Sequence, residues 1–279
     1  MLTAYRVCAT TLTLAAIAFS NTQAQSAADI INQMVSDYEQ QTQGVDNYTV
    51  VQEIMGMETV SYFEKEVVSG HPVFRMRETK TAGMTLSGDE TGSGGWDGWY
   101  TLAPELIARA TYEGTDNLAG QEVHVISVKD LHEIGFGPGM SQDDTDFEPR
   151  SAMLFVDTDE SLMRRMVFKG LLVSDGESHE VTSTVDLQDY REVEGMLHPF
   201  HMTMSMEGLG AAMDAETRKQ YEEMKKQLEE MPASQRKMME EMMKGQMENF
   251  EQMMSGDGPM SVEVRVKEVR INSGPPGGE

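Results

Sequence analysis

The chain of 279 residues carries a formal net charge of −25 and a single cysteine, Cys8. This acidic balance disfavours nucleic acid and anionic membrane surfaces as partners, because like charges repel one another within a Debye length of roughly 10 Å. Cys8 lies in an N-terminal segment with the features of a leader, so disulfides and thiolate chemistry are not expected in the rest of the chain.

Residues 1–24 have the features of a secretory signal peptide. A single positive charge at Arg6 precedes an apolar stretch, and small residues lead up to Ala24. The apolar stretch is much shorter than the roughly 20 residues of a membrane span. We therefore expect cleavage near Ala24 and an exported, periplasmic protein that does not span the membrane, rather than a retained anchor or a short core helix.

Beyond this segment, the pattern predicts one helix and then a long series of strands. Apolar residues at helical spacing indicate an amphipathic helix over 27–41. After Gly44, short runs rich in Val, Ile, Thr, Tyr and Phe are separated by Gly, Pro and Asp, which is typical of consecutive antiparallel strands. We expect a short helix over 104–111 and strands over 47–55, 58–68, 72–80, 96–102, 121–128, 151–157, 163–173, 178–190, 196–206 and 260–271.

Three other segments do not fit the strand pattern. Residues 87–95 and 137–149 are rich in Gly, Ser or Asp, so we expect surface loops there. Residues 214–254 place methionines and leucines mainly three, four and seven apart, and Pro232 divides them. This pattern predicts a Met-rich helical hairpin, inserted over 212–256 before the last strand.

Three short phrases occur in an order that resembles a known family. They are Leu118–Val125, reading LAGQEVHV; Met153–Asp157 followed by Leu162–Arg165, reading MLFVD and LMRR; and Asp189–Phe200, reading DYREVEGMLHPF. With the order of helix, meander, insertion and last strand, these phrases are similar to the LolA/LolB-type lipoprotein carriers and the outer-membrane lipoprotein-sorting proteins. The resemblance covers roughly residues 28–210 and 259–271.

The resemblance implies an α+β fold, mainly β, in which a strongly curved antiparallel sheet forms a half-barrel covered by helices. It also implies that the concave side holds acyl chains in an apolar cavity. We expect one such domain over 25–271, followed by a disordered tail over 272–279.

The residues themselves suggest an apolar ligand surface. Met202, Met204 and Met206 alternate along one strand and share a face, and beside them either Leu154 with Val156 or Met153 with Phe155 points inward. Methionine is flexible and polarisable, so a wall of methionines adapts to an irregular ligand, although it would equally fill a closed core. The candidate cavity and lid residues are Met153, Phe155, Met166, Phe168, Met202, Met204, Met206, Met224, Leu228, Met231, Met239, Met242 and Met243.

Motifs for catalysis and metal binding are missing from the sequence, so we expect no enzyme, no cofactor and no metal site. The segment Asp157–Ser161 starts like a calcium loop, but Leu162 and Phe168 replace the Gly and Glu that such a loop needs, which predicts a hairpin turn. His198 and His201 would point to opposite faces of a strand. Thioethers of the Met-rich segment could bind copper(I), but a packing stripe is the favoured interpretation.

Two functions are compatible with these features. The first is a periplasmic protein that binds a lipid or acylated lipoprotein on its curved sheet, as in outer-membrane lipoprotein sorting, with the Met-rich hairpin as a lid. The second is a non-enzymatic interaction module of the cell envelope that offers the hairpin to a protein partner. Deletion of residues 212–256 discriminates between them, because the first predicts faster loss of the ligand and the second predicts loss of the partner.

Overall fold

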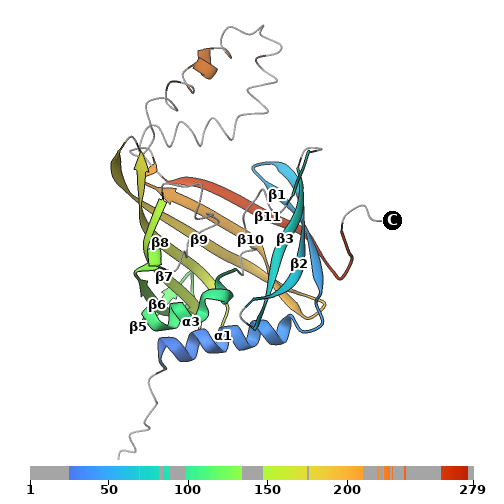
Figure 1. The fold of residues 1–279 in the computed structure, drawn as a ribbon, viewed down its shortest axis with the longest axis vertical. Coiled ribbons are helices and arrows are strands. Elements are labelled where there is room, and N and C mark those ends of the chain that lie inside the picture. Colours follow the sequence, from blue (N-terminus) through green and yellow to red (C-terminus); the bar gives the residue numbers. More distant parts are fainter. Residues whose placement is uncertain are drawn as a thin grey trace, which may run out of the picture.

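The computed structural model describes residues 25–68, 70–81, 84–87, 98–133, 147–174, 176–209 and 259–275, together with 219, 221, 223–226, 228 and 236. One sheet of eleven antiparallel strands dominates these parts of the chain. The sheet is strongly curved, and two helices, α1 (Ala27–Gln41) and α3 (Ala103–Arg109), lie at one of its ends (Figure 1). The expected fold, a curved antiparallel sheet with helices packed on it, is therefore confirmed.

Helix α1 begins at a capping box. The Ser26 hydroxyl accepts from the Asp29 backbone N–H at 3.1 Å, and the Asp29 carboxylate accepts from the Ser26 backbone N–H at 3.1 Å. These bonds satisfy N–H groups that have no partner inside the helix. The expected helix over 27–41 is confirmed, and its buried side chains include Ile30, Ile31, Met34, Val35 and Tyr38.

The strands are, in chain order, β1 (Asn47–Ile54), β2 (Met57–Val68), β3 (His71–Thr81), β4 (Met84–Ser87), β5 (Ala110–Leu118), β6 (Gln121–Lys129), β7 (Phe147–Asp157), β8 (Met163–Ser174), β9 (Glu177–Val193), β10 (Met196–Glu207) and β11 (Met260–Ile271). Across the sheet their order is β4-β3-β2-β1-β11-β10-β9-β8-β7-β6-β5. Strand β11 therefore lies between β1 and β10, as Figure 1 shows. Its register pairs Ile271 with Tyr48 on one side and Val264 with Met202 on the other.

The prediction of a strand over 96–102 is wrong in the described part of that range. Gly98–Leu102 forms the 3-10 helix η1, which leads directly into α3. The Tyr100 ring stacks on Tyr38 of α1 and on Trp99, with ring centroids 4.0 Å and 3.8 Å apart. Packing on α1 thus outweighs the strand preference of aromatic residues, which depends on context.

Strands β4 and β5 were not expected from the sequence. Most side chains of the edge strand β5 are exposed or only partly buried, so it lacks the apolar alternation of a half-buried strand. Its register also shifts between Tyr112 and Gly114, where Gly114 has a φ of 119° that side chains rarely adopt. Strand β4 has only four residues, too few for a periodic pattern.

One face of the sheet, called the inner face here, packs against α1. Tyr48 and Val50 of β1, Leu154 of β7 and Leu187 of β9 belong to this face and form one core with the helices. The opposite face, called the outer face, carries ion pairs such as Arg165 with Asp186. Between the points where the register shifts, side chains alternate between the two faces along each strand, so a residue that pairs with a core residue lies on the inner face and its neighbours in the strand lie on the outer face.

Candidate functional site

Strand β10 carries three methionines on the inner face. Met202 packs against the core, and alternation places Met204 and Met206 on the same face. Met202 lies opposite Leu187 on β9 and Val264 on β11, both of which are buried. Farther along the strand the burial decreases, and Met204 is 41% exposed. The inner face thus changes along β10 from a closed core to an exposed apolar surface.

Other methionines lie at the same end of the inner face. Met260 of β11 lies directly opposite Met206, and Met57 of β2 lies opposite Ile54 of β1. Met57 is 41% exposed, and Met84 of β4 is 65% exposed. The name methionine face is used here for the six methionines at this end of the inner face, Met57, Met84, Met202, Met204, Met206 and Met260.

Along β2 and β3, two pairs of hydroxyl side chains lie between the core and the methionines Met57 and Met84. The pairs are Ser61 Oγ with Thr79 Oγ1 and Thr59 Oγ1 with Thr81 Oγ1, each 2.9 Å apart. Ser61 lies opposite Val50, so both pairs belong to the inner face. Alternation along β2, and the pairing of Thr81 with Met84, place Met57 and Met84 on the same face. Within each pair the two hydroxyls form a hydrogen bond to each other. Thr59, Ser61 and Thr79 are buried, whereas Met57 and Met84 are exposed.

His198 belongs to the closed part of the inner face. Its buried imidazole lies beside the rings of Tyr48 and Phe200, with centroids 6.1 Å away in both cases. Nδ1 donates to the Pro199 carbonyl at 2.8 Å, since a carbonyl oxygen can only accept. Burial lowers the pKa of His198 to about 4, and the bond to Pro199 offsets only part of that effect. The side chain is therefore neutral near pH 7.

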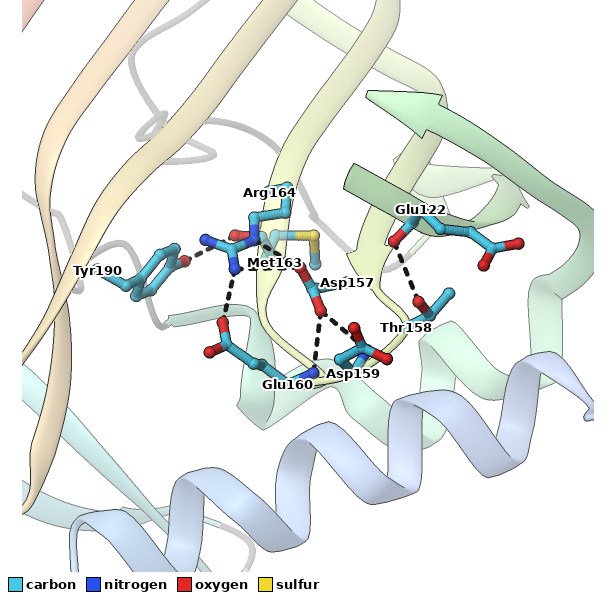
Figure 2. A network of polar contacts seen from close by, with 8 residues as sticks. All are labelled: Glu122, Asp157, Thr158, Asp159, Glu160, Met163, Arg164 and Tyr190. Carbon is cyan, nitrogen blue, oxygen red and sulfur yellow. Dashed lines mark hydrogen bonds and ion pairs between the residues drawn. The ribbon is translucent and has the colours of Figure 1, made fainter. Parts of the chain in front are cut away.

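A polar network surrounds the turn between β7 and β8 (Figure 2). The Asp157 carboxylate accepts from the backbone N–H groups of Asp159 and Glu160, each at 2.9 Å, and from the Arg164 guanidinium at 3.1 Å. The Tyr190 hydroxyl donates to the Met163 carbonyl at 2.7 Å. The Arg164 guanidinium also lies 5.2 Å from the centroid of the Tyr190 ring. The expected hairpin turn after Asp157 is confirmed, because β7 ends at Asp157 and pairs antiparallel with β8, which begins at Met163.

Asp157 and Arg164 form a buried ion pair, with side chains that are 7% and 11% exposed. Burial by itself raises the pKa of Asp157, but the hydrogen bonds from Glu160, Asp159 and Arg164 together outweigh burial and hold that pKa below its usual value. The Asp157 carboxylate is thus ionised near pH 7. The Arg164 guanidinium also donates to the exposed Glu160 carboxylate at 2.7 Å, so Arg164 holds two carboxylates, of which only Asp157 is buried. Loss of Arg164 would leave the buried Asp157 without its cationic partner, which is costly.

The network brings together the three phrases that carry the family resemblance. Glu122 belongs to the first phrase, Asp157 and Arg164 to the second, and Tyr190 to the third. The Glu122 carbonyl accepts from the backbone N–H and the hydroxyl of Thr158, each at 3.2 Å. The phrases therefore join β6, β7, β8 and β9 (Figure 2) and do not line the methionine face.

The predicted ligand residues on β7 and β8 do not lie on the exposed surface of the inner face. Met166 and Phe168 are on the inner face but are only 7% and 2% exposed, so they belong to the closed core. Of the two alternatives on β7, Leu154 is the inward one. Met153 and Phe155 therefore lie on the outer face, because neighbouring residues of a strand point to opposite sides.

Few of the predicted lid residues can be placed. Met224 is 37% exposed and Leu228 is buried, and both are helical. The remaining lid candidates, Met231, Met239, Met242 and Met243, lie outside the described residues, as does the predicted signal peptide over 1–24. Within the Met-rich segment the interpretations as lid, partner helix or copper site all stay predictions.

Sequence reasoning missed three members of the methionine face. Met57 and Met260 are the first residues of their strands, where a periodic pattern is weakest. The two-residue period from Met57 through Thr59 to Ser61 was nevertheless a usable signal. Met84 lies on β4, a strand that was not expected at all. The six methionines lie on one face only because β11 pairs with β1 on one side and with β10 on the other.

In the part of the chain that the structure describes, the His, Asp and Glu side chains form no group of three or more that could hold a metal ion. The helices of this part are too short or too polar for any of them to cross a membrane.

Neither a protein-family model nor a curated protein matches the chain. Solved structures do resemble it. An outer membrane lipoprotein-sorting protein domain from Vibrio parahaemolyticus is 10% identical with a TM-score of 0.41, over 90% of this chain and 94% of that domain. A DUF1329 family protein from Desulfovibrio piger is 11% identical with a TM-score of 0.41, over 89% and 93%. A LolA superfamily protein from Nitrosomonas europaea is 9% identical with a TM-score of 0.35, over 88% and 94%. The first and third carry names of the families that the sequence phrases resemble.

Proposed function

We propose that this protein binds a lipid or an acylated protein, and that an acyl chain lies on the methionine face. The observation that carries the proposal is the exposure of Met57, Met84 and Met204, at 41%, 65% and 41%, on the same face of the sheet that elsewhere forms the core. Large apolar side chains that stay exposed on an otherwise buried face are typical of a binding site.

The chemistry of methionine suits an acyl ligand. The side chain is unbranched and its thioether is polarisable, so several methionines can adjust to a chain whose position varies. Burial of about a dozen methylene groups contributes roughly 10 kcal/mol before the costs of association and ordering are subtracted. The surplus left after those costs is compatible with micromolar binding.

The rest of the inner face supports a defined position for the ligand. Leu187 and Val264 flank Met202 and are 1% and 4% exposed, so the apolar surface ends at a closed core. The core keeps the sheet in one curvature whether or not a ligand is bound, because closely packed interiors deform little. The resemblance of the sequence phrases to lipoprotein carriers supports an acylated ligand and a periplasmic location.

Native mass spectrometry with added lauroyl-lysophosphatidylcholine tests the proposal. We expect a one-to-one complex for the unaltered protein and a weaker complex for the double variant Met57→Gln/Met204→Gln, whose polar amides replace apolar groups on the ligand surface. Met153→Gln is the matched control, because Met153 is 36% exposed but lies on the outer face. Absence of any complex, or equal weakening by the control, would contradict the proposal.

A further inference from the structure

We propose that Met57, Met84 and Met204 are modification sites, at which a peroxide oxidises the thioether to the sulfoxide and thereby lowers the affinity for the acyl ligand. This inference rests on the proposed function and adds a chemical control to the same surface. It follows from the residue type, the exposure and the position of these three side chains.

The three methionines differ in exposure from other methionines of the inner face. Their exposed fractions of 41%, 65% and 41% leave the sulfur within reach of solvent. Within the described core, by contrast, the methionines are nearly inaccessible; they are Met34 at 1%, Met163 at 2%, Met196 at 5% and Met166 at 7%. Oxidation of methionine follows exposure, so one reagent should separate the two groups in a single chain.

The reaction needs only a peroxide as oxidant. A lone pair on sulfur attacks one peroxide oxygen, the O–O bond breaks, and an S–O bond forms while the second oxygen leaves as water after proton transfer. Sulfur loses two electrons and the peroxide gains them. The side chain keeps nearly its length but changes from an apolar group to a polar acceptor of hydrogen bonds.

The position of the three residues makes this change matter for binding and not for folding. None of them belongs to the buried core that α1 closes, so the oxidised groups can remain in water while the protein stays folded. A bound acyl chain, however, would cover the sulfoxide oxygen without offering it a hydrogen-bond donor. Burial of a polar group without a partner is unfavourable, so we expect affinity to fall roughly tenfold or more.

Leucine would provide an equally apolar surface without this sensitivity, which makes leucine the informative replacement. Met57→Leu/Met84→Leu/Met204→Leu should preserve both apolar character and approximate volume. Met153→Leu is the matched control, since Met153 is exposed to a similar degree on the outer face. The control should protect one oxidisable sulfur without protecting the ligand surface.

The experiment treats the full chain with hydrogen peroxide, maps sulfoxides by peptide mass spectrometry, and measures binding of lauroyl-lysophosphatidylcholine before and after treatment. We expect Met57, Met84 and Met204 to oxidise well before Met163 and Met166, and binding to fall in parallel. Each variant is compared with itself before treatment, because the triple leucine variant alters the ligand surface and has an affinity of its own. Treatment should leave the affinity of the triple leucine variant unchanged, whereas it should weaken binding by Met153→Leu as much as by the unaltered protein.

The outcomes separate the inference from the function on which it rests. If the untreated protein does not bind the lysophospholipid, the proposed function fails and the inference fails with it. If the untreated protein binds but oxidation leaves binding unchanged, only the inference is overturned. It is also overturned if the triple leucine variant loses binding on treatment, because the sensitive groups then lie elsewhere, or if core methionines oxidise at the same rate.

Discussion

The two ends of the inner face use the same kind of surface in different ways. Beside α1, side chains of the sheet such as Val156 and Leu154 are 0% and 1% exposed, and the apolar area of the sheet is covered by the protein itself. At the other end, Met84 and Met204 remain 65% and 41% exposed although they continue the same face. One sheet face is therefore divided into a closed part and an exposed part.

The difference between these parts teaches where stability and binding reside. Apolar area that the chain buries stabilises the fold, whereas apolar area left in water is available to another molecule. The closed part also contains the buried His198, and a buried ion pair of Asp157 and Arg164 lies at the turn between β7 and β8; these polar groups require defined partners. Substitutions in the closed part should therefore change stability, and those in the exposed part should change binding.

The largest loss of stability is expected for Asp157→Ala. The substitution removes the buried one of the two carboxylates that Arg164 contacts, leaves only the exposed Glu160, and takes the acceptor from two backbone N–H groups, which should lower the free energy of unfolding by about 3–5 kcal/mol. Urea denaturation followed by circular dichroism measures this. Glu268→Ala is the control, because Glu268 pairs with Arg270 at the surface, where such pairs contribute about 0–1 kcal/mol. Equal losses in the two variants would contradict a special role for the network.

The next largest contrast is between two methionines of the same face. Met166→Ala removes a side chain that is 7% exposed and should cost about 2–5 kcal/mol, because it leaves a cavity in the core. Met204→Ala removes one that is 41% exposed and should cost roughly 0.5 kcal/mol. The same denaturation experiment compares both variants. Similar costs would show that Met204 is part of the core and would remove the division between the two parts.

The smallest of the three effects is a pH dependence due to His198. Its pKa is about 4 in the folded protein and lies near its ordinary value of 6.5 after unfolding, so only the unfolded chain takes up a proton between these values. Stability is therefore full above about pH 6.5, and roughly 2 kcal/mol is lost between pH 7 and pH 5. His198→Asn should flatten this slope, because neither the folded nor the unfolded chain then has an imidazole at this position. An unchanged slope in His198→Asn would assign the pH dependence to other groups.

Much of the fold could be predicted from the sequence because local pattern and tertiary structure agree. The helical spacing of Ile30, Met34 and Tyr38 reflects the face that packs on the sheet, and the turn after Asp157 follows from its short polar residues. The sequence pattern is a weak guide where contacts between distant residues decide the local structure. Tyr100 forms a ring stack on Tyr38 that no local preference indicates, and β5 is an edge strand without an apolar side.

The candidate site was predicted in part for the same reason. Alternation groups Met202, Met204 and Met206 within a single strand, and the structure keeps them on one face. Met57 and Met84 join them only through pairing across β11, which involves residues more than 200 positions apart. Sequence spacing also left two choices on β7, and only the packing of Leu154 into the core decides which residues face inward.

The central place of β11 also sets an order for assembly. Strands β1 to β4 form one group and β5 to β10 another, and in the sheet only β11 bridges them, with Asn272 reaching back 228 residues to the Gly44 carbonyl. Until β11 inserts, β1 and β10 are open edges, and closing so long a loop is slow. Met57 and Met84 belong to one group and Met204 to the other, so the methionine face is complete only once β11 has paired with both groups.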